Sequence, residues 1–150
     1  MDEQLAEAWA RLMTLFMSRR DVLFAALSEM GLTPPHGHAL MSLLHGGHTR
    51  MRELADLMAC DASYITSVAD RLEELGFAER RIAPDDRRVK ELALTKRGET
   101  VARRLDAIFS QPPATMCNLS KADRAHLARI ACLLADDSPT GNWIPPLKLR

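Results

Sequence analysis

The chain has little of several features that mark common classes of protein. Its formal net charge at pH 7 is zero, and only 5% of its 150 residues are aromatic. It has three cysteines, which lie far apart and form no CxxC pair: Cys60, Cys117 and Cys132. Neither a disulfide framework nor a zinc knuckle is therefore expected, and the cysteines are predicted to be reduced thiols.

Long apolar runs and enzyme motifs are also missing. The sequence begins MDEQLAEAWARL, without the basic and then apolar layout of a signal peptide, so a cytoplasmic protein with no membrane span is expected. There is no GxSxG, HExxH, Gly-rich phosphate loop or CxxC, and nothing pairs a nucleophile with a base. We therefore predict that the chain is not an enzyme and has no cofactor. Its apolar fraction of 47% and charged fraction of 27% are those of a folded domain with a core.

Charge is distributed unevenly along the chain. Residues 53–79 contain seven acidic residues and one basic residue, a balance of −6. Residues 80–104 contain nine basic and four acidic residues, a balance of +5. The chain thus has a local basic patch, which includes the stretch DDRRVKELALT at residues 85–95.

Apolar residues spaced every three or four positions predict helices, whose ends are set by glycine, proline and capping residues. The predicted helices cover residues 5–30, 34–44, 51–59, 62–75, 96–111 and 121–134. Between the fourth and fifth helices the period changes, and strands over 77–82 and 89–94 are predicted to form a hairpin. The turn-rich tail at 137–150 is expected to be only partly ordered, although Trp143 and Ile144 could dock elsewhere.

Two short helices joined by a tight turn and followed by a hairpin are the layout of a winged helix-turn-helix. The predicted fold class is therefore α+β, mostly α. The fourth helix is predicted to bury one apolar stripe, formed by Ile65, Val68, Ala69, Leu72 and Leu75. Its outward face carries short polar side chains and one tyrosine, which can reach base edges in a major groove.

Two motifs in this region point to a known family. The hairpin carries the pattern D-x-R-x-x-x-x-x-L-T, with Asp86, Arg88, Leu94 and Thr95 at the fixed positions and Gly98 three residues on. Upstream lies RELADLMACDASYITSVADRLEELGFAERR at residues 52–81. Together these motifs resemble the core of the MarR family of bacterial transcription regulators, over about half of the chain.

The resemblance implies one MarR-like domain over 1–150, with a winged core at about 33–98. It implies dimerisation helices at about 1–30 and 99–136, and a homodimer that places two winged cores on a pseudo-palindromic operator. The implied function is that of a sequence-specific DNA-binding transcriptional regulator, more often a repressor than an activator. A small aromatic or lipophilic effector, bound between the winged core and the dimerisation helices, would release it.

In that family the wing arginine enters the minor groove and the acidic residue two before it helps to hold it, so the resemblance assigns these roles to Arg88 and Asp86. The predicted DNA-binding residues are Ser63, Tyr64, Thr66, Ser67, Arg71, Asp86, Arg87, Arg88 and Lys90. Two alternatives stay open: the wing pair merely cross-links a solvated hairpin, and the helix residues are merely exposed.

The sequence departs from the family pattern in one respect. Many members carry an arginine where this chain has Ser67, and the helix-turn-helix is net acidic. Binding is therefore expected to depend heavily on the wing. The same acidity favours the alternative function, a winged-helix module that binds protein and not DNA.

Four of the five histidines fall within thirteen residues: His36, His38, His45 and His48. Metal sensing is one interpretation, but two of these histidines lie two positions apart on one helix and point to different faces. No metal site is predicted. A thiol switch at Cys60 is the alternative to a small buried hydrophobe, which its position favours.

Overall fold

The computed structural model describes residues 2–83 and 85–136, so the predicted tail with Trp143 and Ile144 lies outside the described residues. The chain forms two compact units, Met1–Phe109 and Ser110–Arg150. A single domain over 1–150 stays a prediction. None of the described helices is long and apolar enough to cross a membrane.

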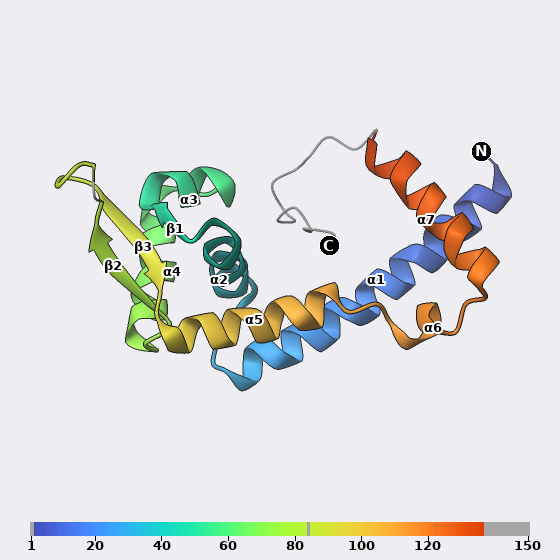
Figure 1. Ribbon diagram of the computed structural model, residues 1–150, viewed down its shortest axis with the longest axis horizontal. Coiled ribbons are helices and arrows are strands. Elements are labelled where there is room, and N and C mark those ends of the chain that lie inside the picture. The colour runs from blue at the N-terminus through green and yellow to red at the C-terminus, as the bar shows by residue number, and fades with distance from the viewer. Residues whose placement is uncertain (1, 84, 137–150) are drawn as a thin grey trace. The chain divides into compact units, whose positions relative to one another are not determined.

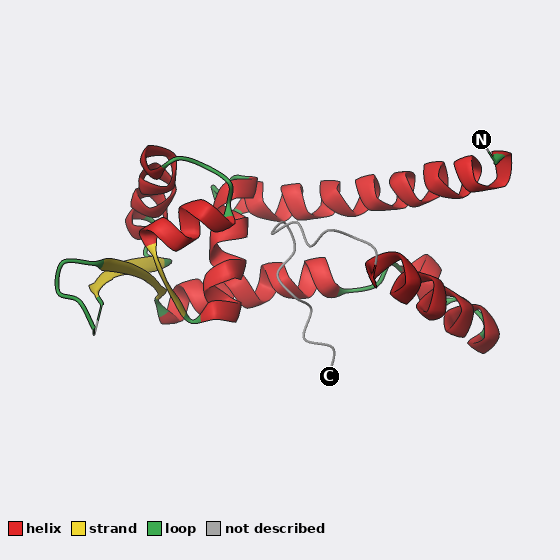
Figure 2. Cartoon of the chain, turned by 90° about the horizontal axis from the view of Figure 1, so that it is seen from above, coloured by secondary structure: helices red, strands yellow, loops and turns green. Residues whose placement is uncertain are grey.

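The elements of the first unit follow each other as drawn in Figures 1 and 2. They are α1 (Glu3–Glu29), α2 (Pro34–Gly46), β1 (His48–Arg50), α3 (Met51–Leu57), α4 (Ala62–Glu74), β2 (Ala78–Ile82), β3 (Lys90–Leu94) and α5 (Lys96–Ser110). The described part of the second unit holds α6 (Ala114–Cys117) and α7 (Lys121–Asp136). The α+β, mostly α fold class is confirmed, and every predicted helix ends within two residues of its predicted position.

The sheet is antiparallel with strand order β1-β3-β2, so β3 is the central strand. Leu92 of β3 lies opposite both Thr49 of β1 and Arg80 of β2. The β2–β3 hairpin was predicted, but β1 was not, because three residues are too few to display an alternating pattern. The short helix α6 was also missed, because its four residues are too few to repeat an apolar position.

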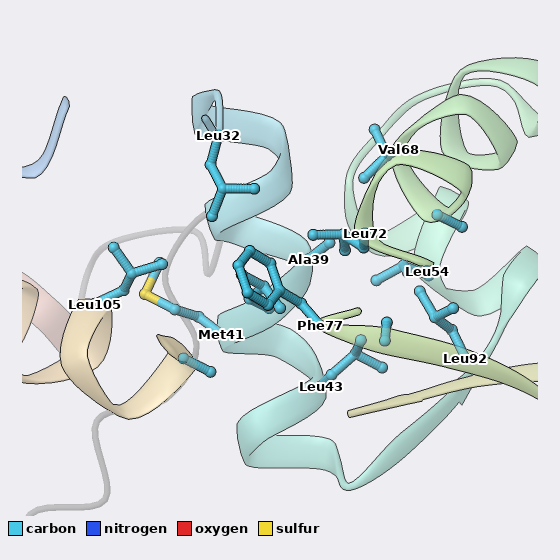
Figure 3. Close-up of a cluster of buried hydrophobic side chains, with 14 of the residues drawn as sticks. Leu32, Ala39, Met41, Leu43, Leu54, Val68, Leu72, Phe77, Leu92 and Leu105 are labelled. Atoms are coloured by element: carbon cyan, nitrogen blue, oxygen red, sulfur yellow. The ribbon is translucent and has the colours of Figure 1, made fainter. Parts of the chain in front are cut away.

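The core of the first unit is built around α2. Figure 3 shows the side chains of α2 between Leu105 of α5 and the residues of α3, α4 and the sheet. The largest fully buried side chains are Leu27, Leu40, Leu43, Leu54, Ile65, Leu72, Leu92 and Leu105. Every helix and two strands of the winged core thus contribute to one apolar cluster. The stripe predicted for α4 is confirmed, with Leu75 partly buried.

Contacts between α1 and α5 add polar links to this unit. The Arg104 guanidinium lies 3.2 Å from the Glu29 carboxylate, and Arg19 donates a hydrogen bond of 2.6 Å to the Ile108 carbonyl. These two contacts connect the last part of α1 to the helix that follows the wing.

The end of α4 and the start of α5 meet in a tight junction. The carbonyl of Phe77 accepts a 3.1 Å hydrogen bond from the Thr95 N–H. The Thr95 hydroxyl donates to the Gly76 carbonyl at 2.7 Å and accepts from the Gly98 N–H at 3.0 Å. Above the same junction, the Arg97 guanidinium lies 5.0 Å from the centre of the Phe77 ring. Thr95 therefore caps α5, as predicted, and also fastens the root of the wing.

The junction leaves no room for a side chain at Gly98. A Cβ there would lie 1.7 Å from the Phe77 carbonyl oxygen, which is backbone and cannot rotate away. Gly98→Ala should therefore lower the free energy of unfolding by at least about 2 kcal/mol in urea denaturation. As a control, a Cβ at Gly46 would meet only the Thr49 hydroxyl, at 3.5 Å, so Gly46→Ala should be neutral or slightly stabilising. Equal effects of the two substitutions would contradict the role of the junction.

Candidate nucleic-acid interface

The fourth helix begins at a well-formed cap. The Asp61 carboxylate accepts hydrogen bonds from the Tyr64 N–H at 2.8 Å and from the Ser63 hydroxyl at 2.6 Å. The hydrogen bond from Ser63, and then that from the Tyr64 backbone, hold the pKa of Asp61 below its ordinary range. Asp61 caps α4, as predicted. The preceding residue, Cys60, packs partly buried against the core, and burial followed by the charge of Asp61 raises the pKa of its thiol.

The outward face of α4 is exposed over its first three turns. Tyr64 keeps 46% of its surface accessible, and Ser67 is exposed beside it. The hydroxyls of Ser63 and Thr66 donate to Asp61 and to the Ala62 carbonyl, so each retains only acceptor capacity for a ligand. The structure thus brings the four predicted residues of this helix together on one polar surface.

The fifth predicted residue of α4 lies elsewhere. The Arg71 guanidinium donates to Glu74 at 3.1 Å and lies close to Gly31, in the turn before α2. Burial and then the charge of Arg71 lower the pKa of His36. Arg71 therefore lies near the turn between α1 and α2, and the structure does not bring it together with the wing arginines.

The acidity of α4 is balanced by an arginine from the wing. Arg80 of β2 donates through its guanidinium to Asp70 at 2.6 Å and forms a short ion pair with Glu73, and its N–H donates to Glu73 at 2.8 Å. Its side chain is only 21% exposed. Asp70 and Glu73, which contribute to the net acidity of the helix-turn-helix, are therefore each paired with a cation within the fold. Sequence reasoning missed this pairing, although the opposite charge balances of the two segments were its signal.

At the wing tip, the contact between Asp86 and Arg88 involves the backbone. The Asp86 carboxylate accepts a 2.9 Å hydrogen bond from the Arg88 N–H, and the Asp86 carbonyl accepts from the Val89 N–H at 3.0 Å. Asp86 thus fixes the turn from which the Arg88 side chain projects. The side chains of Arg87, Arg88 and Lys90 are exposed and make no ion pair within residues 2–83 and 85–136.

A second aspartate ties the tip of the wing to β1. Arg50 donates to the Asp85 carboxylate in a short hydrogen bond. That bond, first among the causes, lowers the pKa of Asp85 and raises the pKa of Arg50. Neither residue was predicted as part of the site, because no sequence pattern indicated that β1 pairs with β3.

Two of the four clustered histidines face carboxylates. His45 Nε2 lies 3.1 Å from Asp106, and His48 Nε2 lies 3.7 Å from Glu91. Among the described residues, no group of three or more histidine, cysteine, aspartate or glutamate side chains is placed to hold a metal ion. The absence of a metal site stays a prediction.

The second unit contains a pocket of about 350 Å³. It is lined mostly by apolar side chains of the segment around α6 and of α7, among them Met116 and Leu127. Arg124, also on its wall, donates to the Leu119 carbonyl at 2.9 Å and so crosses from one segment to the other. The effector site predicted between the winged core and the dimerisation helices stays a prediction.

Comparison with known proteins shows what this chain is similar to. The model of the MarR family matches residues 32–90. Over 143 residues the chain is 27% identical to the HTH-type transcriptional repressor MdtR of Bacillus subtilis (strain 168). The match covers 93% of this chain and 90% of that protein. The resemblance of the winged core to the MarR family is thereby confirmed.

Solved structures of other proteins share the fold of this chain. The YusO protein from Bacillus subtilis matches with a TM-score of 0.75 and 27% identity, over 91% of this chain and 98% of that one. A mutant MarR from E. coli complexed with operator DNA matches with a TM-score of 0.59 and 20% identity, over 89% of this chain and 99% of that one. The second likeness shows a common fold.

The cap of α4 gives a test of what stabilises the start of this helix. Asp61→Ala should lower the Tm, because the Tyr64 N–H loses its acceptor, whereas Asp61→Ser should retain most of the stability. Since the folded state lowers the pKa of Asp61, this contribution is fully present above the ordinary pKa of about 3.9 and is lost as the pH falls through the lower folded value. The Tm difference between wild type and Asp61→Ala, followed by circular dichroism, should therefore shrink on acidification. A constant difference would contradict the capping role.

Proposed function

We propose that this protein is a member of the MarR family and a sequence-specific DNA-binding transcriptional regulator that acts in the cytoplasm. Repression, relieved by a small aromatic or lipophilic effector, is the mode we propose. One observation carries the proposal: α4 presents a polar face beside a wing whose two tip arginines make no ion pair in the described part of the chain. A regulator of this kind needs no catalytic group, and the absence of enzymatic activity stays a prediction.

The face of α4 supports base recognition. Its N-terminal residues, Ser63, Tyr64 and Ser67, are short or planar side chains on an exposed surface. A helix enters a major groove with such residues against base edges, and a tyrosine ring can contact a thymine methyl. The well-capped first turn supports this role because it keeps these residues helical at the point of contact.

The wing supports phosphate and minor-groove contact. Arg87 and Arg88 lie at a turn that Asp86 stabilises through the backbone, so their guanidinium groups remain available. Lys90 adds a third exposed cation at the start of β3. Positive groups at a protruding hairpin release counterions when they meet DNA, which contributes affinity without reading sequence.

The alternative, a winged-helix module that binds protein, rested on the acidity of the helix-turn-helix. Pairing of Asp70 and Glu73 with Arg80 removes much of that argument, because the charges are compensated within the fold. The exposed cations of the wing also match phosphates better than a protein surface without dense negative charge. DNA binding is therefore the function that the geometry supports best.

A homodimer on a pseudo-palindromic operator belongs to the same proposal. Large apolar side chains are exposed on α1 and α7: Leu5, Trp9, Leu12, Phe16, Met17, Ile130, Leu133 and Leu134. Apolar surface of this extent on single helices is typical of helices that pack against another chain. Two winged cores related by a two-fold axis would then meet two half-sites.

Light scattering should give twice the chain mass of 16.7 kDa at micromolar concentration. Phe16→Glu should shift the protein toward monomer and weaken operator binding, because a charge replaces an apolar side chain that is 45% exposed in the single chain. Arg11→Ala, an exposed position whose side chain pairs with Glu7, is the matched control and should leave the dimer intact. A stable folded wild-type monomer would contradict the paired half-site arrangement.

Substitutions in the wing and in α4 should have different effects on DNA binding. Arg88→Ala should weaken binding to operator and random duplex alike and reduce the salt slope by about one counterion, with a milder form of the same effect for Asp86→Ala. Tyr64→Ala should cost on the order of 1–3 kcal/mol on operator and leave random-duplex binding nearly unchanged. Gel shifts with the upstream DNA of the gene and a random duplex, over a series of salt concentrations, measure both effects. Unchanged binding by Arg88→Ala would give first place to the protein-interaction alternative.

A further inference from the structure

We propose that the ion pair between Arg50 and Asp85 holds the wing tip in the orientation from which Arg88 meets DNA. Arg50 and Asp85 are then positioning residues, which act through Arg88 and need no DNA contact of their own. The inference rests on the proposed function, and it assigns a role to two residues outside the motifs that mark the family.

Arg50 occupies a point where three elements meet. It is the last residue of β1, stands at the N-cap position of α3, and lies opposite Glu91 of β3 in the sheet. Its Nε atom is 4.0 Å from both the Glu53 and the Glu91 carboxylates, and its Nη2 donates to Asp85. The Glu91 side chain is only 10% exposed, so one end of this network is fixed in the sheet. The guanidinium thereby connects the folded core to the loop at the far end of the hairpin.

Two consecutive aspartates make different contacts at the wing tip. Asp85 attaches the loop to Arg50, and Asp86 attaches the Arg88 N–H to the loop at 2.9 Å. Without the first attachment, the second would orient Arg88 only relative to a loop whose residues 85–88 are themselves exposed. Their mutual hydrogen bond is the first cause of the lowered pKa of Asp85 and of the raised pKa of Arg50, so the contact favours the charged form of both groups.

The direction in which substitution of Asp85 changes the DNA affinity distinguishes a positioning role from a purely electrostatic one. Asp85 is a negative charge near the cations that we propose meet phosphates, so charge alone predicts that its removal tightens DNA binding. Removal would also release Arg50, which strengthens the same expectation. A positioning role predicts the opposite, because a released wing tip must be ordered again when DNA binds. An exposed ion pair contributes little to global stability, so the fold should survive.

Asp85→Asn should therefore weaken operator binding about threefold to tenfold, the order expected when a flexible side chain must be immobilised on binding. In an Arg88→Ala background the same substitution should no longer weaken binding, since there is no arginine left to position. Gel shifts with the upstream DNA and a random duplex measure both effects, and circular dichroism checks the fold.

Glu79→Gln is the matched control. Glu79 pairs with Arg81 two residues away in β2, with both side chains about half exposed, and links no second element. Its neutralisation should tighten binding slightly or leave it unchanged.

Hydrogen exchange in the free protein gives a readout that does not need DNA. The Arg88 amide, bonded to Asp86 in the wild type, should exchange faster in Asp85→Asn but not in Glu79→Gln. Unchanged exchange, equal or tighter operator binding by Asp85→Asn, or an equal loss in the Arg88→Ala background would each overturn the positioning role. Wild-type protein that bound neither duplex would instead overturn the proposed function, and this inference with it.

Discussion

The contact of Gly98 with the backbone of Phe77 is the constraint on which the winged unit depends. It lets the first turn of α5 lie directly against Phe77, the third residue after α4. The hydrogen bonds of Thr95 to Gly76 and Gly98 then fix the same junction. Because β2 begins and β3 ends there, the root of the hairpin is held at the end of the recognition helix. The residues of the family pattern therefore divide by role: Asp86 and Arg88 serve the tip, and Thr95 and Gly98 serve the root.

Charge in this protein is arranged as complementary segments and not as one basic surface. Arg80 pairs with Asp70 and Glu73 of α4, and Arg50 lies within ion-pair distance of Glu53, Asp85 and Glu91. Among the described charges that make no ion pair are those of Arg87 and Arg88 at the wing tip. A chain of zero net charge can in this way present a local cationic group, since pairing elsewhere removes competing fields.

Most of the fold could be predicted from sequence, because long helices repeat their apolar positions and end at glycines and prolines, as at Gly31 and Gly76. The strand β1 could not, since its three residues gain order only from pairing with β3. On the candidate site, the outward face of α4 followed from periodicity, whereas the environment of Arg71 and the pairing of Arg80 and Arg50 did not. Those contacts join residues up to 40 positions apart, and a single sequence records no such distances.

The strand order β1-β3-β2 leaves two edges where a foreign strand could add to the sheet. One edge, β1, offers only three residues. The other, β2, carries the consecutive charges of Glu79, Arg80 and Arg81, so a strand laid along it would have to take these groups out of water. The protruding hairpin can therefore expose its backbone groups in a crowded solution with little tendency to assemble into extended sheets.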